Sequence, residues 1–360
     1  MNIELELRRE GIIAIKQLNT LIVNSIATNI AQKLVKNFPE QNFDYSTLFT
    51  KIAKLNMYVA KIPNGVAAKY FYKNSSIYFS EHTDLENLNE VVIHECIHAI
   101  QAEINSKNLL IQLGLCDFTD SKLSGMALNE AAVQLMTMKC SKSRLGTVKY
   151  FDIELPSNSP DYYTLECNLV RQMAFITGEY VLYNSTLFGN DNFQNKFINL
   201  TSKQDFEIIK SNINYIMYLE DQLNLILNKI QNTDKKAKRL VHKADKLKKA
   251  IKTEFLSTQN KIFTSFFDKR FNYVCNTAKS IETFRRALYT YRRFIGVSDD
   301  YTFFNEYYIN KMSELDNKFN NANSKSLALI PIKETLFART VRKIYSLVIL
   351  KGDYDYTSIK

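Results

Sequence analysis

The segment VVIHECIHAIQAE, residues 91 to 103, constrains this chain more than any other stretch. It carries His94, Glu95 and His98 in the order H-E-x-x-H, within an apolar frame that no Gly or Pro interrupts. Since each residue of a helix turns ~100°, His94 and His98 lie about 40° apart and one turn apart along the axis. Two imidazoles placed in this way can bind one tetrahedral zinc ion, and Glu95 on the flank can reach a water at that ion.

A zinc site of this kind needs a third protein ligand. An extension of the motif would require His at the position of Ile104, and Glu103 points ~140° away from His98 on the same helix. The remaining candidate is Glu130, in the segment GMALNEAAVQLMTMK, which we predict to be a second helix with an apolar surface. A carboxylate there is costly to bury unless it is paired or bound to metal. The alternative is an ordinary core helix with two partly buried histidines.

The order HECIH followed by LNEAAVQ resembles the gluzincin metallopeptidases, in which a glutamate on a following helix completes the zinc site. It is most similar to the compact bacterial members that carry a short L-N-E-A-x-x-Q helix. The resemblance covers roughly residues 56 to 185. It implies an α+β, zincin-like catalytic unit in which His94, His98 and Glu130 bind Zn²⁺ and Glu95 is the general base.

The helix that carries the third ligand shows one departure from thermolysin-like members. Asn129 and Gln134 match positions of the short helix motif. Thermolysin-like enzymes have an acid one turn after the ligand glutamate, where it supports a zinc-bound histidine. Gln134 stands there in this chain, and its carbonyl oxygen can accept a histidine N–H while making that histidine less basic.

A donor for the oxyanion is the least defined part of the expected site. Ser159 as N-cap and Pro160 at the first position predict the start of a helix. In the compact family a helix at this place packs behind the site and often begins with tyrosine. Stabilising the transition state requires a hydrogen-bond donor aimed at the oxyanion. Tyr163 is the candidate, and Tyr162 and Tyr180 are alternatives.

Short runs rich in Tyr, Phe, Val and Ile precede the H-E-x-x-H helix, at residues 57–63, 67–73 and 76–81. Turn residues separate them, so we predict a small antiparallel sheet immediately before that helix. A strand edge beside the zinc can pair with an extended peptide through backbone hydrogen bonds. Residues 77–80 are the candidate for this edge, with an ordinary internal strand as the alternative.

The second half of the chain has a different character. From residue 204 to about 297 it is almost free of Gly and Pro and is predicted to be helical. We expect a zincin-like domain over residues 1–200 and an all-helical domain over 201–360. Residues 233–252 form a basic helix with a narrow apolar stripe. It could bind an acidic partner, or it is one arm of a solvated helical hairpin.

Composition narrows the classes of function. A net charge of +10 over 360 residues is typical of an ordinary surface, so nucleic-acid binding is not favoured. Five cysteines without paired spacing argue against a disulfide framework. The N-terminus is charged and lacks a signal peptide, and residues 11–35 are too polar to span a bilayer. We therefore expect a cytoplasmic protein without a transmembrane segment.

Together these patterns predict a zinc metallopeptidase that hydrolyses peptide or protein substrates, as an endopeptidase or an aminopeptidase. The alternative is a zincin-fold protein of weak or no activity that acts as an interaction module through its helical C-terminal half. Two features motivate this alternative: Gln134 in place of an acid, and an oxyanion donor that the sequence does not single out.

Overall fold

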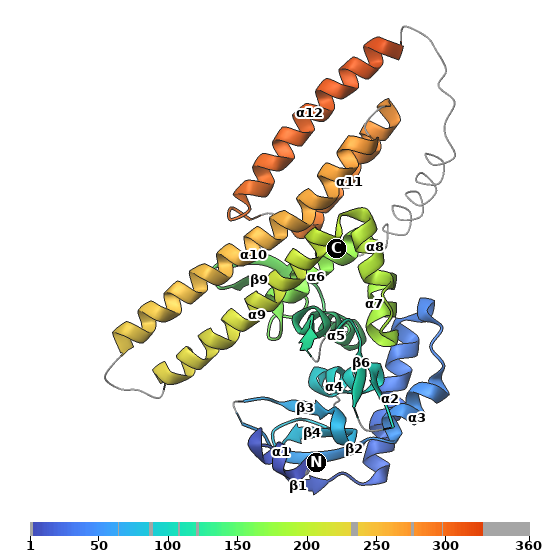
Figure 1. The fold of residues 1–360 in the computed structure, drawn as a ribbon, viewed down its shortest axis with the longest axis vertical. Coiled ribbons are helices and arrows are strands. Elements are labelled where there is room, and N and C mark those ends of the chain that lie inside the picture. Colours follow the sequence, from blue (N-terminus) through green and yellow to red (C-terminus); the bar gives the residue numbers. More distant parts are fainter. Residues whose placement is uncertain are drawn as a thin grey trace. The chain divides into compact units, whose positions relative to one another are not determined.

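The computed structural model describes residues 3–63, 65–85, 89–106, 109–119, 122–231, 237–274, 277–296 and 298–326. These residues are mostly helical, with small sheets in the first half of the chain, which is compatible with the α+β class (Figure 1). They fall into two compact units. The first comprises Met1–Lys269 and Thr290–Phe304, and the second comprises Arg270–Tyr289 and Asn305–Lys360.

The largest sheet lies in the first unit and has the strand order β1-β2-β4-β3. Its strands are β1 (Ile13–Gln17), β2 (Asn56–Lys61), β3 (Ala68–Phe71) and β4 (Ser76–Ser80). The β1/β2 and β3/β4 pairs are antiparallel, but β2 and β4 are parallel, so the prediction of an antiparallel sheet is wrong in this respect. The physical reason is burial: β4 is the most buried strand and takes a central position with a partner on each side.

The two edges of this sheet are β1 and β3, so residues 77–80 do not form an edge and lie instead in an internal strand, the alternative given above. Ser80 donates its N–H to the carbonyl of Ala67 at 2.8 Å, so alternate residues of β3 face β4. By that alternation Tyr70 directs its backbone N–H and C=O away from β4. Helix α4 (Glu90–Gln101) packs beside β3, which brings this edge to the H-E-x-x-H motif.

Helix α4 is confined to 12 residues around the motif. Its N-cap is Asn89, whose side chain accepts the N–H of Val92 at 3.3 Å. It ends at Gln101, and the chain then forms a hairpin of β5 (Ala102–Ile104) and β6 (Leu110–Leu113). The alternation of half-buried and exposed residues in β6 is a strand pattern.

Helices α5 (Met126–Ser141) and α6 (Thr164–Thr177) complete the centre of the first unit. The predicted α5 is confirmed. The predicted start of α6 at Ser159 is wrong, because Ser159 belongs to a turn: its hydroxyl donates to the carbonyl of Tyr162 at 2.5 Å, and its own carbonyl accepts Thr164 Oγ1–H at 2.9 Å. Tyr163 is the N-cap residue, in the left-handed conformation with φ 51°.

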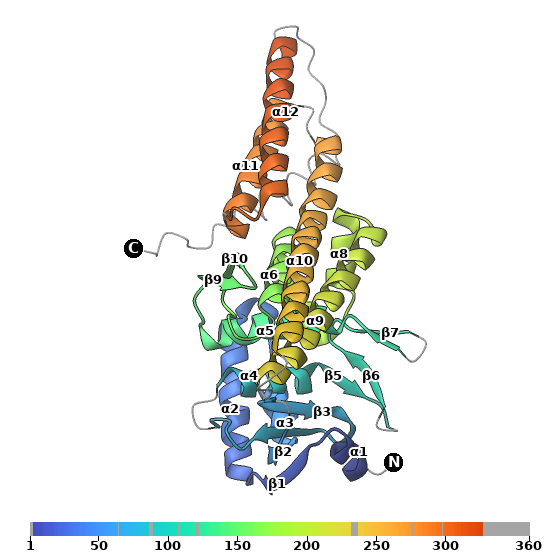
Figure 2. The ribbon, with the colours of Figure 1, turned by 90° about the vertical axis from the view of Figure 1, so that its left-hand side faces the viewer.

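The first unit contains further helices and strands besides these central helices (Figure 2). Residues 11–37 contain the strand β1 and then α2, and residues 148–155 contribute to a hairpin. The bounds are α1 (Ile3–Arg9), α2 (Thr20–Asn37), α3 (Tyr45–Ala53), β7 (Asp117–Thr119), β8 (Lys122–Ser124), β9 (Gly146–Tyr150), β10 (Ile153–Ser157), α7 (Glu179–Phe188), α8 (Asn192–Leu200), α9 (Lys203–Gln231) and α10 (Ala237–Val274).

Residues 203–269, which we expected in a separate helical domain, pack in the first unit. Helix α9 contacts α5 and α6. Near the start of α5, Ala127 N–H donates to Asn214 Oδ1 of α9 at 3.0 Å, and Lys210 pairs with Asp117 at 2.7 Å. Helix α9 therefore packs against α5, the helix that carries Glu130.

The second unit contains the end of α10, α11 (Ala278–Ile295) up to Tyr289, and most of α12 (Thr302–Ser326). Phe271 and Phe284 pack edge to face at 5.6 Å, and Arg285 forms an ion pair with Asp316. The predicted last helix over residues 332–350 lies outside the described residues.

Two carboxyl groups are buried together between α6 and α9. Glu166 is fully buried and Glu220 is 8% exposed. Burial raises the pKa of Glu166 to about 7, and burial together with the negative charge of Glu166 raises the pKa of Glu220 well above its usual range. At neutral pH at least one of the two carboxyl groups is therefore protonated. As pH rises, ionisation of the pair destabilises the packing of α6 against α9.

We expect Glu166→Gln to stabilise the protein at pH 8 much more than at pH 5. The folded pKa of about 7 exceeds the usual value of 4.5, so stability is fully present below pH 4.5 and is lost as pH rises through 7. A shift of this size corresponds to about 3 kcal/mol. Urea unfolding at both pH values measures the difference, with Glu103→Gln, at an exposed position, as the control. A native protein that gains stability between pH 6 and 8 would contradict this assignment.

Candidate metal centre

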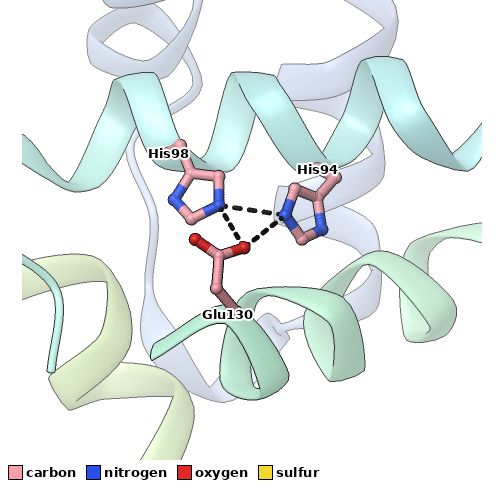
Figure 3. A group of neighbouring side chains, drawn as sticks. All are labelled: His94, His98 and Glu130. Atoms are coloured by element: carbon pink, nitrogen blue, oxygen red, sulfur yellow. Dashed lines mark hydrogen bonds and ion pairs between the residues drawn. The ribbon is translucent and has the colours of Figure 1, made fainter. Parts of the chain in front are cut away.

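Three ligand atoms converge between α4 and α5 (Figure 3). The Nε2 atoms of His94 and His98 are 2.9 Å apart, and they lie 3.1 and 3.2 Å from Glu130 Oε2. A tetrahedral zinc ion with ligands at ~2.0–2.1 Å separates its ligand atoms by about 3.3 Å. The observed spacing needs only a small expansion to reach that value, and two imidazole nitrogens with one carboxylate oxygen are a common zinc donor set. These residues therefore fit a metal ion.

The apolar side of α4 fixes the rotation that turns both histidines toward α5. Val92, Ile93, Cys96 and Ile97 are all fully buried. These four side chains occupy the opposite part of the helix surface. His94 and His98, four residues apart, therefore face α5. His94 and His98 are each 7% exposed, so the site is largely closed to solvent.

The two histidines keep Glu130 ionised, as a metal ligand would have to be. Burial alone would raise the pKa of this carboxyl, but the charges and hydrogen bonds of His98 and His94 hold it well below its usual range. For His98 burial works to lower the pKa, and Glu130 raises it above the ordinary value. The carboxylate is thus ionised, and it lies in an apolar region only because the two imidazoles offset its burial.

The outer nitrogens of both histidines contact glutamine side chains. His94 Nδ1 lies 2.9 Å from Gln134 Oε1, the contact that the sequence allowed. Gln134 Nε2 donates in turn to Ser159 Oγ at 3.0 Å. His98 Nδ1 lies 2.7 Å from Gln101 Nε2. Such partners fix the ring orientation of a ligand histidine.

Of the three tyrosine candidates, Tyr163 is the one at the site. Its ring stacks on the His94 ring with centroids 5.9 Å apart and an interplanar angle of 15°. Burial, followed by the negative charges of Glu130 and Glu95, raises the pKa of its hydroxyl well above 10, so it remains a donor. Tyr162 and Tyr180 are 41% and 48% exposed.

Glu95 follows His94 directly and is partly buried. Its Oε2 accepts the backbone N–H of Tyr70 at 2.6 Å, on the edge strand β3. Its negative charge contributes to the raised pKa values of His98 and Tyr163, as expected for a carboxylate that faces the same site. One oxygen of Glu95 is therefore held by β3.

The sequence did not predict four groups that contact the site: Gln101, Ser159, Gly114 and the N–H of Tyr70. Gln101 had a detectable signal, because it lies three residues after His98 on the same helix. Gly114 has a φ of 49°, and an added Cβ there would lie 2.3 Å from Gln101 Oε1. The Tyr70 contact depends on the strand order, for which the sequence held no signal.

Other candidate residues lie away from the centre. His82 and His242 are exposed, and Cys96, Cys116, Cys140 and Cys167 are buried and unpaired. The described part of the predicted basic segment, residues 237–252, is the start of α10. Its exposed cations are Lys238, Arg239, Lys243, Lys246 and Lys249.

Comparisons with protein families, with characterised proteins and with solved structures find no match for this chain. Within the described residues, none of the helices combines the length and apolar character needed to cross a bilayer.

We expect Glu130→Ala to reduce the zinc content of the purified protein clearly below that of the native chain, which should hold about one ion. The variant removes the only carboxylate of the ligand group. Glu103→Ala, which removes an exposed glutamate just after α4, serves as the matched control and should keep its zinc. Elemental analysis per chain measures all three. Equal zinc in the native protein and in Glu130→Ala would exclude Glu130 as a ligand.

Proposed function

We propose that this protein is a zinc-dependent peptidase that hydrolyses peptide bonds with Glu95 as general base. The observation that carries the proposal is the convergence of His94, His98 and Glu130, with Glu95 on the same helix as both histidines. The resemblance of HECIH and LNEAAVQ to gluzincins agrees with the same assignment of residues.

Zinc bound by His94, His98 and Glu130 would polarise the scissile carbonyl and acidify a water molecule. Glu95 would accept a proton from that water and deliver it to the leaving amine. The N–H of Tyr70 holds Oε2 of Glu95 at 2.6 Å, so Oε1 is the oxygen left for the proton. A carboxylate fixed at one oxygen needs little reorganisation when it accepts a proton at the other.

Tyr163, whose ring stacks on the ring of His94, would supply a hydrogen-bond donor. Its hydroxyl stays protonated over the neutral range because burial and nearby carboxylates raise its pKa. A buried, neutral O–H can stabilise the charge that develops on the carbonyl oxygen in the transition state. The left-handed backbone at Tyr163 places the side chain at the N-terminus of α6, above His94.

The edge strand β3 gives a peptide substrate a place to pair. Ala68 and Tyr70 both direct their backbone groups away from β4, and α4 lies beside β3. An extended peptide on that edge would accept the N–H of Ala68 and donate to the carbonyls of Ala68 and Tyr70. It would then lie next to Glu95, which already contacts the same edge.

Glu95→Gln should keep its zinc and lose hydrolysis by about 10²–10⁴-fold, because general acid–base catalysis contributes that much and an amide accepts no proton. Cleavage of a quenched fluorescent peptide library, with zinc content measured in parallel, gives both readouts. Equal peptidase rates for the two proteins would rule out the role of Glu95. Zinc binding without cleavage in either protein would favour the interaction module.

Tyr163→Phe should lower kcat by about 10²–10³-fold and leave KM nearly unchanged, since the hydroxyl acts in the transition state. Tyr162→Phe changes a neighbouring, exposed tyrosine in the same way and should have little effect. Steady-state kinetics on one cleaved peptide compares them. A larger loss of kcat in Tyr162→Phe than in Tyr163→Phe would show that Tyr163 is not the hydrogen-bond donor.

A further inference from the structure

A cavity of about 310 Å³ lies where the C-terminal end of α5 meets α6, α7 and the turn that precedes α6. Cavities of this size are in the range that holds small-molecule ligands. Three of its lining residues are cations, Lys139, Lys142 and Arg171, and one, Glu179, is an anion. Three cations against one anion leave an excess of two positive charges. The cavity shares no residue with the metal centre.

The two lysines of the cavity lack a close acceptor. Lys139 Nζ lies 3.8 Å from Glu40 Oε1 and 3.9 Å from Glu179 Oε2, which is too far for a hydrogen bond. It lies 5.0 Å from the centroid of the Tyr183 ring. Lys142 forms no ion pair with any residue that the structure describes. Lysines at the end of a helix commonly offset the negative end of its dipole, but these two also line a cavity, where their N–H groups can bind an anion.

Tyr183 brings a polar group of an otherwise buried side chain to the same cavity. The residue is 5% exposed, and its hydroxyl has no hydrogen-bond partner within the described part of the chain. Burial, followed by the charge of Glu179, raises the pKa of this hydroxyl well above its usual range, so it keeps its proton and can donate. Enclosed polar groups are normally hydrogen-bonded, and an oxygen of a ligand in the cavity would satisfy this one.

The turn before α6 adds an amide to the lining. Ser143 Oγ donates to the backbone carbonyl of Asn158 at 2.7 Å, which joins the end of α5 to the turn. The side chain of Asn158 makes no hydrogen bond to the residues described, and one end of its amide is buried. Because an amide both donates and accepts, it can bind a hydroxyl group of a ligand.

Arg171 is held in place on the α6 side of the cavity. One of its terminal nitrogens donates to the carbonyl of Pro156 at 3.3 Å, and its guanidinium lies 4.9 Å from the centroid of the Phe294 ring. A guanidinium has five N–H donors in a rigid plane, so a cation positioned in this way can still bind an anion.

The positions of these donors favour a phosphate group over a carboxylate. They come from the end of α5, from α6 and from α7, so they approach the cavity from different directions. A phosphate monoester has three terminal oxygens and a charge of about −1.5 to −2 at pH 7, whereas a carboxylate has two oxygens and a single charge. Only the phosphate group matches both the number of donors and the excess of two positive charges. The cavity is larger than this group alone, and Leu135 and Asn158 line the remaining space.

We propose that this cavity binds a small organic phosphate, with Lys139, Lys142 and Arg171 holding the phosphate group and Tyr183 donating to one of its oxygens. Asn158 and the exposed carboxylate of Glu179 are the partners for hydroxyl groups of the organic part. The proposal goes beyond the peptidase activity and does not depend on it, because none of these residues belongs to the metal centre.

The direct test is isothermal titration calorimetry of the full chain with three probes: ribose 5-phosphate, inorganic phosphate and succinate. We expect one molecule of ribose 5-phosphate to bind per chain, more tightly than inorganic phosphate, because its sugar fills the rest of the cavity. Succinate should bind more weakly than both. No binding of either phosphate up to about 10 mM would overturn the proposal. Equal affinities for the two phosphates would overturn the organic part of the ligand, and succinate binding as tightly as ribose 5-phosphate would overturn the assignment of phosphate.

Two variants locate the binding site. Lys142→Asn removes one cation, and asparagine suits the left-handed backbone at this position, where φ is 54°. It should weaken the binding of ribose 5-phosphate by about tenfold, because it removes a charge-assisted hydrogen bond. Tyr183→Phe removes only the hydroxyl and should weaken binding by about 3–10-fold. Lys243→Asn on α10 and Tyr215→Phe on α9 make the same changes at exposed positions and should leave the affinity unchanged.

The paired variants distinguish a defined site from general attraction by a basic surface. Equal weakening by Lys142→Asn and Lys243→Asn would overturn the proposal, and so would unchanged affinity in both Lys142→Asn and Tyr183→Phe. If Tyr183→Phe does not fold, the comparison of Lys142→Asn with Lys243→Asn still decides the question, since both lysines are exposed.

Discussion

The contact of one buried carboxylate with two imidazoles joins α4 to α5 at the candidate metal centre. Glu130 lies on a helix whose surface is otherwise almost entirely buried, where an unpaired carboxylate would be costly. His94 and His98 offset that cost, and removing one partner of such a buried pair typically costs about 3–5 kcal/mol. Helices α4 and α5 are therefore fixed to each other by polar contacts as well as by apolar packing.

The amide network extends this constraint to the rest of the site. Gln134 connects His94 to Ser159, and Ser159 donates to the carbonyl of Tyr162. The turn that places Tyr163 over His94 is thus bonded, through two side chains, to the ligand itself. On the other side, β3 holds Glu95 through the N–H of Tyr70. Glu130 on α5, the N–H of Tyr70 on β3 and Tyr163 at the start of α6 all contact residues of α4.

The sequence predicted the parts of the site that depend on local spacing. The separation of His94 and His98 on one helix, and an apolar helix around Glu130, can be read from residues a few positions apart. It did not predict the strand order, because a parallel β2/β4 pair depends on which strand is most buried, a property of the whole sheet. The start of α6 was also wrong, since Ser159 and Pro160 carry a helix-start signal that the hydrogen bonds of a turn override.

Several residues near the site are at odds with their local surroundings. Tyr163 has a left-handed backbone without being glycine or asparagine, Gln101 and Asn129 each bury an amide atom without a partner, and Glu166 buries a carboxyl one turn after Tyr163. Each of these features costs stability by itself. A chain selected only for stability would replace them, since apolar or glycine substitutions are available at such positions. At Tyr163 and Gln101, which contact His94 and His98, a role in the candidate site gives a reason for residues that folding alone does not favour.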